Sequence, residues 1–97
     1  MKLHYTPRAI ADLEEIADYL KSRSALGAQN VRNAILSTLK TLTDFPRIGC
    51  LQTTSGVRKI CTRKYPYLVY YTVDDVADEI IILAVRHTAR ERNFPDT

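Results

Sequence analysis

Features that mark secreted, membrane-spanning or metal-binding proteins are scarce in this sequence. Its 97 residues include two cysteines, Cys50 and Cys61, without the Cys-x-x-Cys spacing of a zinc or redox site. Such sparse cysteine use is typical of a reducing compartment. The apolar run 80–85 is far shorter than the ~20 residues that cross a bilayer. The first residues pass at once into Thr6-Pro7-Arg8. We therefore expect a cytoplasmic protein with no signal peptide and no membrane partner.

The motifs of several enzyme classes are also missing. The sequence contains no glycine-rich phosphate loop, no His-Glu-x-x-His zinc motif and no Gly-x-Ser-x-Gly nucleophile motif. The acidic group Asp74, Asp75, Asp78 and Glu79 has no glycine for the sharp bend of an ion-binding loop, so we interpret it as a solvated turn. We therefore expect no cofactor and no metal.

The composition is that of one globular domain, 1–97, in which the positive charge is unevenly placed. Hydrophobic residues make up 45% and charged residues 26%, which argues against disorder. The net charge is only +3, but no acid occurs between Val57 and Val73, whereas four acids lie between Asp12 and Asp18. The basic residues of the C-terminal half form two blocks: Arg58, Lys59, Arg63 and Lys64, then Arg86, Arg90 and Arg92.

Apolar periodicity predicts a helical hairpin after a short strand at 2–5. Thr6 suits an N-cap and Pro7 the first helical position. Two stretches of helical spacing follow, separated by Ser24 and Gly27, and so short a turn requires the helices to be antiparallel. The expected apolar stripes are Ile10, Leu13, Ile16, Ala17 and Leu20 in the first helix, and Val31, Ala34, Ile35, Thr38, Leu39 and Leu42 in the second.

The remainder reads as an antiparallel meander of strands at 57–62, 67–73 and 79–87. The last strand is apolar on both faces, with Ile80, Ile82 and Ala84 on one. This predicts a central strand that the hairpin covers on one side and that is partly covered on the other. The element order is β-α-α-β-β-β. The fold class is therefore α+β, with the N-terminal helical hairpin packed on a small, mostly antiparallel four-stranded sheet.

The meander brings basic residues together. Its first and third strands run parallel, so Arg63 and Lys64 should lie at the same margin as Arg86 and His87, about two strand spacings or on the order of 10 Å away. The corner 65–67 lies between them. Such a rim suits phosphates, stacked bases or an acidic partner, although a merely solvated sheet end has the same pattern. His87 is the candidate general base of this cluster.

Several segments in order resemble one family. They are Tyr5-Thr6-Pro7-Arg8-Ala9, Phe45-Pro46-Arg47-Ile48-Gly49, Gly56-Val57-Arg58, Tyr67-Leu68-Val69-Tyr70-Tyr71 and Val85-Arg86-His87-Thr88-Ala89-Arg90. Together they resemble the RelE/ParE superfamily of toxins from bacterial type II toxin–antitoxin modules, and the closing segment is most similar to ParE. The resemblance implies a cognate antitoxin that neutralises the toxin by direct binding. We expect an antitoxin helix along the hairpin, followed by an extended segment on a sheet edge.

The resemblance to ParE implies a toxin that inhibits DNA gyrase by binding, not by catalysis. Its target-binding residues would be Arg58, Lys59, Arg63, Lys64, Tyr67, Arg86, His87 and Arg90. The alternative is a RelE-like, ribosome-dependent mRNA endonuclease, with Arg58, Lys59, Arg63 and Arg86 as cations around the scissile phosphate and His87 as proton acceptor. The C-terminal tyrosine of many RelE-like nucleases is missing here. A degenerate, weakly toxic module kept for plasmid or locus maintenance is the third reading.

Overall fold

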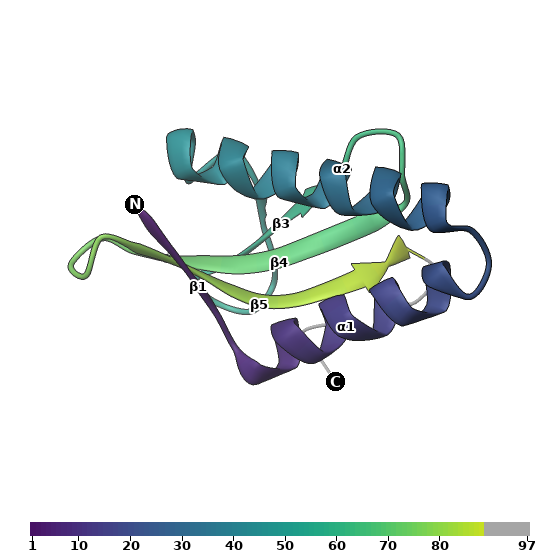
Figure 1. The fold of residues 1–97 in the computed structure, drawn as a ribbon. Helices are drawn as coiled ribbons and strands as arrows, with labels where there is room; N and C mark the ends of the chain where they lie inside the picture. The colour runs from purple at the N-terminus through teal and green to yellow at the C-terminus, as the bar shows by residue number, and fades with distance from the viewer. Residues whose placement is uncertain (89–97) are drawn as a thin grey trace.

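A computed structural model describes residues 1–88 and shows two helices against one mixed sheet (Figure 1). The sheet order is β1-β5-β4-β3-β2, with β1 parallel to β5 and every other pair antiparallel. The predicted α+β class is confirmed, and the predicted elements occur in the expected order with one additional strand, β2. The elements are β1 (Lys2–Tyr5), α1 (Pro7–Lys21), α2 (Ala25–Asp44), β2 (Cys50–Leu51), β3 (Val57–Cys61), β4 (Tyr67–Asp74) and β5 (Glu79–His87).

The sheet has five strands where four were expected, because residues 50–51, predicted as part of a loop, form the strand β2. This strand has only two residues, Cys50 and Leu51, which pair with Lys59 and Arg58 of β3. Two residues are too few to show the alternation by which a strand is recognised in sequence. The strand exists because the chain leaving α2 passes beside β3, which is a tertiary and not a local cause.

Helix α1 begins as predicted but is rotated relative to the expected stripe. Thr6 is its N-cap, and the Thr6 hydroxyl accepts the Ala9 N–H at 3.1 Å. Ala9 is fully buried, whereas Ile10 is 48% exposed, so including Ile10 in the core was wrong. Thr6 and Asp12 both hydrogen bond to the backbone of β5, and these bonds turn the side of α1 that carries Ala9 toward the sheet.

Helix α2 follows the predicted pattern closely. Ser24 caps it by accepting the Gly27 N–H at 3.0 Å. Its buried residues are Val31, Ile35, Thr38, Leu39 and Leu42. Figure 1 shows α1 and α2 running in opposite directions along the sheet, with the turn between them at the end where β5 stops. The predicted antiparallel hairpin is therefore confirmed. Neither helix, in the part of the chain that is described, is long and apolar enough to cross a membrane.

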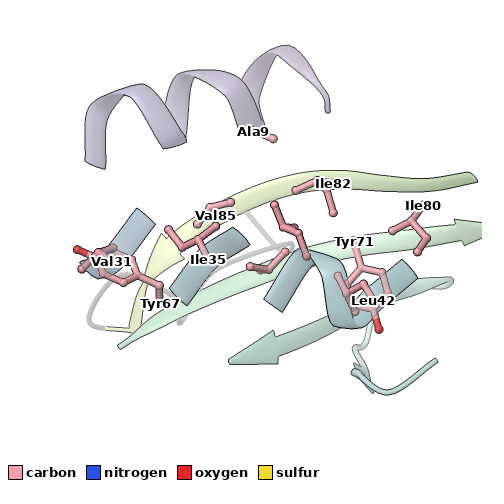
Figure 2. Close-up of a cluster of buried hydrophobic side chains, with 11 residues drawn as sticks. Ala9, Val31, Ile35, Leu42, Tyr67, Tyr71, Ile80, Ile82 and Val85 are labelled. Carbon is pink, nitrogen blue, oxygen red and sulfur yellow. The ribbon is translucent and has the colours of Figure 1, made fainter. Parts of the chain in front are cut away.

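The main core lies between the helices and one face of β4 and β5 (Figure 2). Ile80 and Ile82 of β5 point into it, but Val85 does so in place of Ala84. The predicted alternation along this strand was therefore wrong beyond Ile82. Tyr70 pairs with Ala84 and Tyr71 with Ile82, which leaves Leu83 as the extra residue of a β-bulge. One extra residue moves every following side chain to the other face.

The second face of the sheet carries its own small apolar cluster. Val57, Leu68, Tyr70 and Ala84 are buried there, from three neighbouring strands. We call this side, opposite the helices, the open face. The position of β5 between β1 and β4 agrees with the interior strand that was expected from its apolar character on both sides.

Candidate functional site: the rim where β3 and β5 end

The strand ends meet as the meander predicted. Cys61, the last residue of β3, pairs with Leu68, which in turn pairs with Arg86 near the end of β5. Two further backbone bonds close this margin: the Thr62 N–H donates to the Tyr67 carbonyl at 2.9 Å, and the Thr88 N–H donates to the Pro66 carbonyl at 2.8 Å. The corner 63–66 and the end of β5 therefore form one margin, which we call the rim.

Arg63 and Lys64 lie in the corner of the rim, both exposed to solvent. The backbone of Lys64 has φ of +72°, the left-handed region that turns the chain sharply from β3 into β4. This tight corner projects two basic side chains and then returns to the sheet within a few residues. The predicted pair of cations is thus part of the rim.

Lys59 and Arg86 pair with residues of the open face. Lys59 pairs with Tyr70, and Arg86 pairs with Leu68. Cross-strand partners share a face, and both Tyr70 and Leu68 are in the open-face cluster. Lys59 therefore lies on the side of the sheet that the helices do not cover, whereas Arg86, at the margin, also lines a cavity beside α1. Lys59 is set back from the rim by two residues along β3.

Tyr67 and His87 pair on the helix side of the rim. Their ring centroids are 5.4 Å apart and the rings are nearly perpendicular, at 86°. Tyr67 is only 7% exposed, so its ring supports the rim and offers little surface to a target. Burial raises the pKa of the Tyr67 phenol, and the neighbouring Tyr19 hydroxyl raises it further. The phenol therefore stays neutral at physiological pH.

Arg58 is not brought to the rim. Its guanidinium donates to the carbonyl oxygens of Gly49 at 2.8 Å and Arg47 at 3.1 Å, on the helix side of the sheet. The Gly49 N–H in turn donates to the Tyr71 hydroxyl at 2.8 Å. Arg58 thus holds the segment that enters β2, a structural role that the basic character of this stretch did not suggest. Arg90, the remaining predicted site residue, lies outside the described residues.

A cavity of about 1050 Å³ opens beside the rim, between the end of the sheet and α1. The α1 wall of this cavity, which was not predicted from the sequence, carries the acids Asp12 and Glu15, and Arg86 and His87 line the cavity from β5. The Asp12 carboxylate also accepts the Val85 N–H at 3.0 Å, which fixes this part of α1 against β5. The full lining is Asp12, Glu15, Ile16, Tyr19, Leu20, Gly27, Val31, Tyr65, Pro66, Tyr67, Val85, Arg86 and His87.

The spacing of residues in the sequence already places the members of this wall on one side of a helix. Asp12, Glu15 and Tyr19 are spaced three and four residues apart, so they follow one another along a single side of a helix. Only the packing of α1 beside β5 shows that this side borders the rim.

A second cavity, of about 510 Å³, lies between the two helices. Its walls are mostly apolar, with Leu13, Ile16 and Leu20 from α1 and Ile35, Leu36 and Leu39 from α2, and Lys21, Gln29 and Arg32 also line it. Leu36, which lines this groove, is 45% exposed, a large fraction for a leucine. We call it the hairpin groove. No group of three or more metal-ligating side chains is found among residues 1–88.

A helical hairpin on this mixed sheet is the fold of the RelE/ParE toxins. The isolated RelE toxin of E. coli superposes with a TM-score of 0.68 at 20% identity, covering 98% of this chain and 92% of that one. The chromosomal ParDE toxin–antitoxin system of P. aeruginosa contains a chain with a TM-score of 0.74 and 27% identity, covering 90% and 95%.

Sequence comparison identifies the family within this fold. Residues 3–92 match the model of the ParE toxin of the type II toxin–antitoxin system parDE. A relative named Toxin RelE2, from Caulobacter vibrioides, is 34% identical over 87 residues, which cover 89% of this chain and 93% of the relative. The chain therefore belongs to the ParE toxin family, and it is the toxin component of a type II toxin–antitoxin system.

Proposed function

We propose that this toxin acts by binding DNA gyrase at the rim, and that a cognate antitoxin neutralises it by direct binding. The observation that carries the first part is the mixed charge of the rim cavity. A polyanion entering it would meet the carboxylates of Asp12 and Glu15, whereas a protein surface, which carries both signs of charge, can match both walls. Membership in the ParE family supports the same target.

The arrangement of the cations also favours binding over mRNA cleavage. A nuclease of the RelE type needs a proton acceptor and several cations around one phosphate. Here the His87 ring lies against Tyr67 on the helix side, whereas Lys59 and Arg86 share faces with open-face residues. Arg58 is committed to backbone carbonyls. The residues required for a nuclease are therefore dispersed over two faces of the sheet.

Two assays performed side by side test the target. Purified toxin is added to gyrase in a DNA supercoiling and cleavage assay, and to programmed ribosomes in an mRNA cleavage assay. We expect gyrase-dependent DNA breaks with intact mRNA, and we expect the simultaneous replacement of Arg63 and Lys64 by glutamate to abolish the breaks. Glutamate at Val76 serves as the control, because Val76 is fully exposed in the β4–β5 turn, away from the rim.

The mRNA endonuclease is the second candidate, supported by the 34% identity to a relative named Toxin RelE2. Its signature is cleavage of mRNA on the ribosome that disappears in Arg86→Ala or His87→Ala. That result would replace gyrase as the target. Absence of both activities, from toxin that is folded and binds its antitoxin, would instead identify a degenerate module.

The hairpin groove is the proposed docking site of the antitoxin. Its apolar walls and the half-exposed Leu36 suit the apolar side of an amphipathic helix. β1 lies at the edge of the sheet, where an extended segment of the antitoxin would add a strand. The structural neighbour from P. aeruginosa belongs to a toxin–antitoxin pair, which supports a partner of this kind.

Replacing one groove residue tests this docking site. Leu36→Glu places a charge in the apolar groove and should weaken antitoxin binding at least tenfold, measured by titration calorimetry. Val76→Glu adds the same charge at a fully exposed position and should leave binding within twofold. Equal binding by both variants would show that the antitoxin does not use the groove.

A further inference from the structure

The rim cavity and the hairpin groove are neighbours with a common wall. Ile16, Leu20 and Val31 line both of them. The two cavities therefore lie on either side of the same few side chains, near the turn between the helices. A polypeptide that fills the groove needs only to pass this turn to reach the cavity, so occupation of both by one partner is geometrically simple.

The rim cavity is lined by more aromatic rings than the groove, where Tyr5 is the aromatic residue of the lining. Tyr19, Tyr65 and Tyr67 all line the rim cavity, and the faces of such rings attract cations. Tyr19 already shows this behaviour, because the Arg23 guanidinium lies 4.5 Å above the centroid of its ring. Tyr19 and Tyr67 line the cavity from two different elements, α1 and β4.

Negative charge lies beside these rings. Glu15 borders the cavity one helical turn from Tyr19, and Tyr19 and Leu20 belong to the last turn of α1, where the helix dipole favours a positive charge. Arg86 lines the cavity from the end of β5, so this cation lies across the cavity from the rings and Glu15 of α1. The α1 side of the cavity therefore offers an aromatic ring and a carboxylate, two groups that attract a cation.

We propose that the rim cavity receives a lysine or arginine side chain of the cognate antitoxin, inserted between Tyr19 and Glu15. The inference rests on the antitoxin partner proposed above and adds how that partner reaches the rim. An antitoxin anchored there covers His87 and the corner at 63–66, so it neutralises the toxin by occupying its target-binding surface. The same anchor distinguishes cognate antitoxins from others that lack a basic residue at this position.

Two pairs of variants test the anchor by titration calorimetry with the purified product of the neighbouring antitoxin gene. Glu15→Lys should weaken binding by tenfold or more, whereas Glu14→Lys, with the same change of net charge on an exposed residue outside the cavity, should change it by less than twofold. Tyr19→Leu should weaken binding about three- to thirtyfold, but Tyr19→Phe, which keeps the aromatic face, should not. Tyr19 is 56% exposed, so both of its variants should fold.

A double-mutant cycle then identifies the inserted residue. Each lysine and arginine of the antitoxin is replaced by methionine, and binding is measured to wild-type toxin and to Glu15→Gln. The proposal requires that one basic residue couples to Glu15, with losses that are not additive. Equal effects of Glu14→Lys and Glu15→Lys, or the absence of any coupled residue, overturn it.

The outcomes separate this inference from the proposed function. If wild-type toxin does not bind the antitoxin at all, the partner itself is wrong. If it binds, and Leu36→Glu weakens binding whereas Glu15→Lys does not, the antitoxin occupies the groove without inserting a cation into the rim cavity.

Discussion

Replacing Asp12 by alanine should release α1 from β5 and loosen one wall of the rim. The Asp12 carboxylate accepts the Val85 N–H at 3.0 Å, across 73 residues of sequence. Val85 is almost fully buried, so the truncated variant removes the protein acceptor of its N–H. Leaving a buried donor unsatisfied costs about 1–3 kcal/mol. For a domain of this size, 1 kcal/mol lowers Tm by about 4–8 °C, so we expect a decrease of roughly 4–24 °C.

Asp12→Asn is the matched variant, because its amide oxygen can still accept the Val85 N–H. The remaining loss is the difference between a charged and a neutral acceptor, about 1 kcal/mol. Glu14→Ala serves as the control for helix composition, since Glu14 is exposed on the same helix. Thermal and urea denaturation of the purified toxin measure all three. The reasoning is refuted if Asp12→Ala costs no more than Glu14→Ala, or if asparagine is as damaging as alanine.

Three further perturbations follow from the contacts. Gly49→Ala should cost about 1–3 kcal/mol, because a Cβ there would lie 2.6 Å from the Tyr71 hydroxyl, whereas Gly27→Ala meets nothing closer than 3.4 Å and should be neutral or stabilising in denaturant melts. Burial raises the pKa of Tyr67 and Tyr71, so the folded state favours their neutral forms. The free energy of unfolding should therefore be highest below pH about 10 and should fall as the pH rises further. Phenolate absorbance should appear together with unfolding. Arg58→Ala should lower the unfolding free energy by about 1–2 kcal/mol while leaving antitoxin affinity unchanged.

Local signals identified most of the elements. Thr6 and Pro7 marked the start of α1, and the apolar spacing of α2 marked its buried side, because both depend on residues within one or two helical turns. The bulge at Leu83 carried no such signal. Its cause is the pairing of β5 with β4, which a single strand cannot show, and it moves Val85 into the core in place of Ala84.

The candidate site divides in the same way. The convergence of the corner at 63–66 with the end of β5 followed from strand direction alone, so it could be predicted. Arg58 was misread because a basic residue in a basic stretch gives no sign that it will bond to the carbonyls of a distant turn. Glu15 was missed because nothing in α1 indicates which element it will lie beside.

The sequence by itself determined the order of the elements, the antiparallel hairpin and the shared margin of β3 and β5, since these depend on periodicity, caps and short connections. Only the tertiary structure decided that the acids of α1 face the rim, because the rotation of a helix is set by its contacts with other elements. That rotation is determined by two hydrogen bonds to β5: the Asp12 carboxylate accepts the Val85 N–H, and the Thr6 hydroxyl donates to the Leu83 carbonyl. Two hydrogen bonds, each between residues more than seventy positions apart, thus place the acids of α1 beside the basic end of the sheet, where they line one cavity with Arg86.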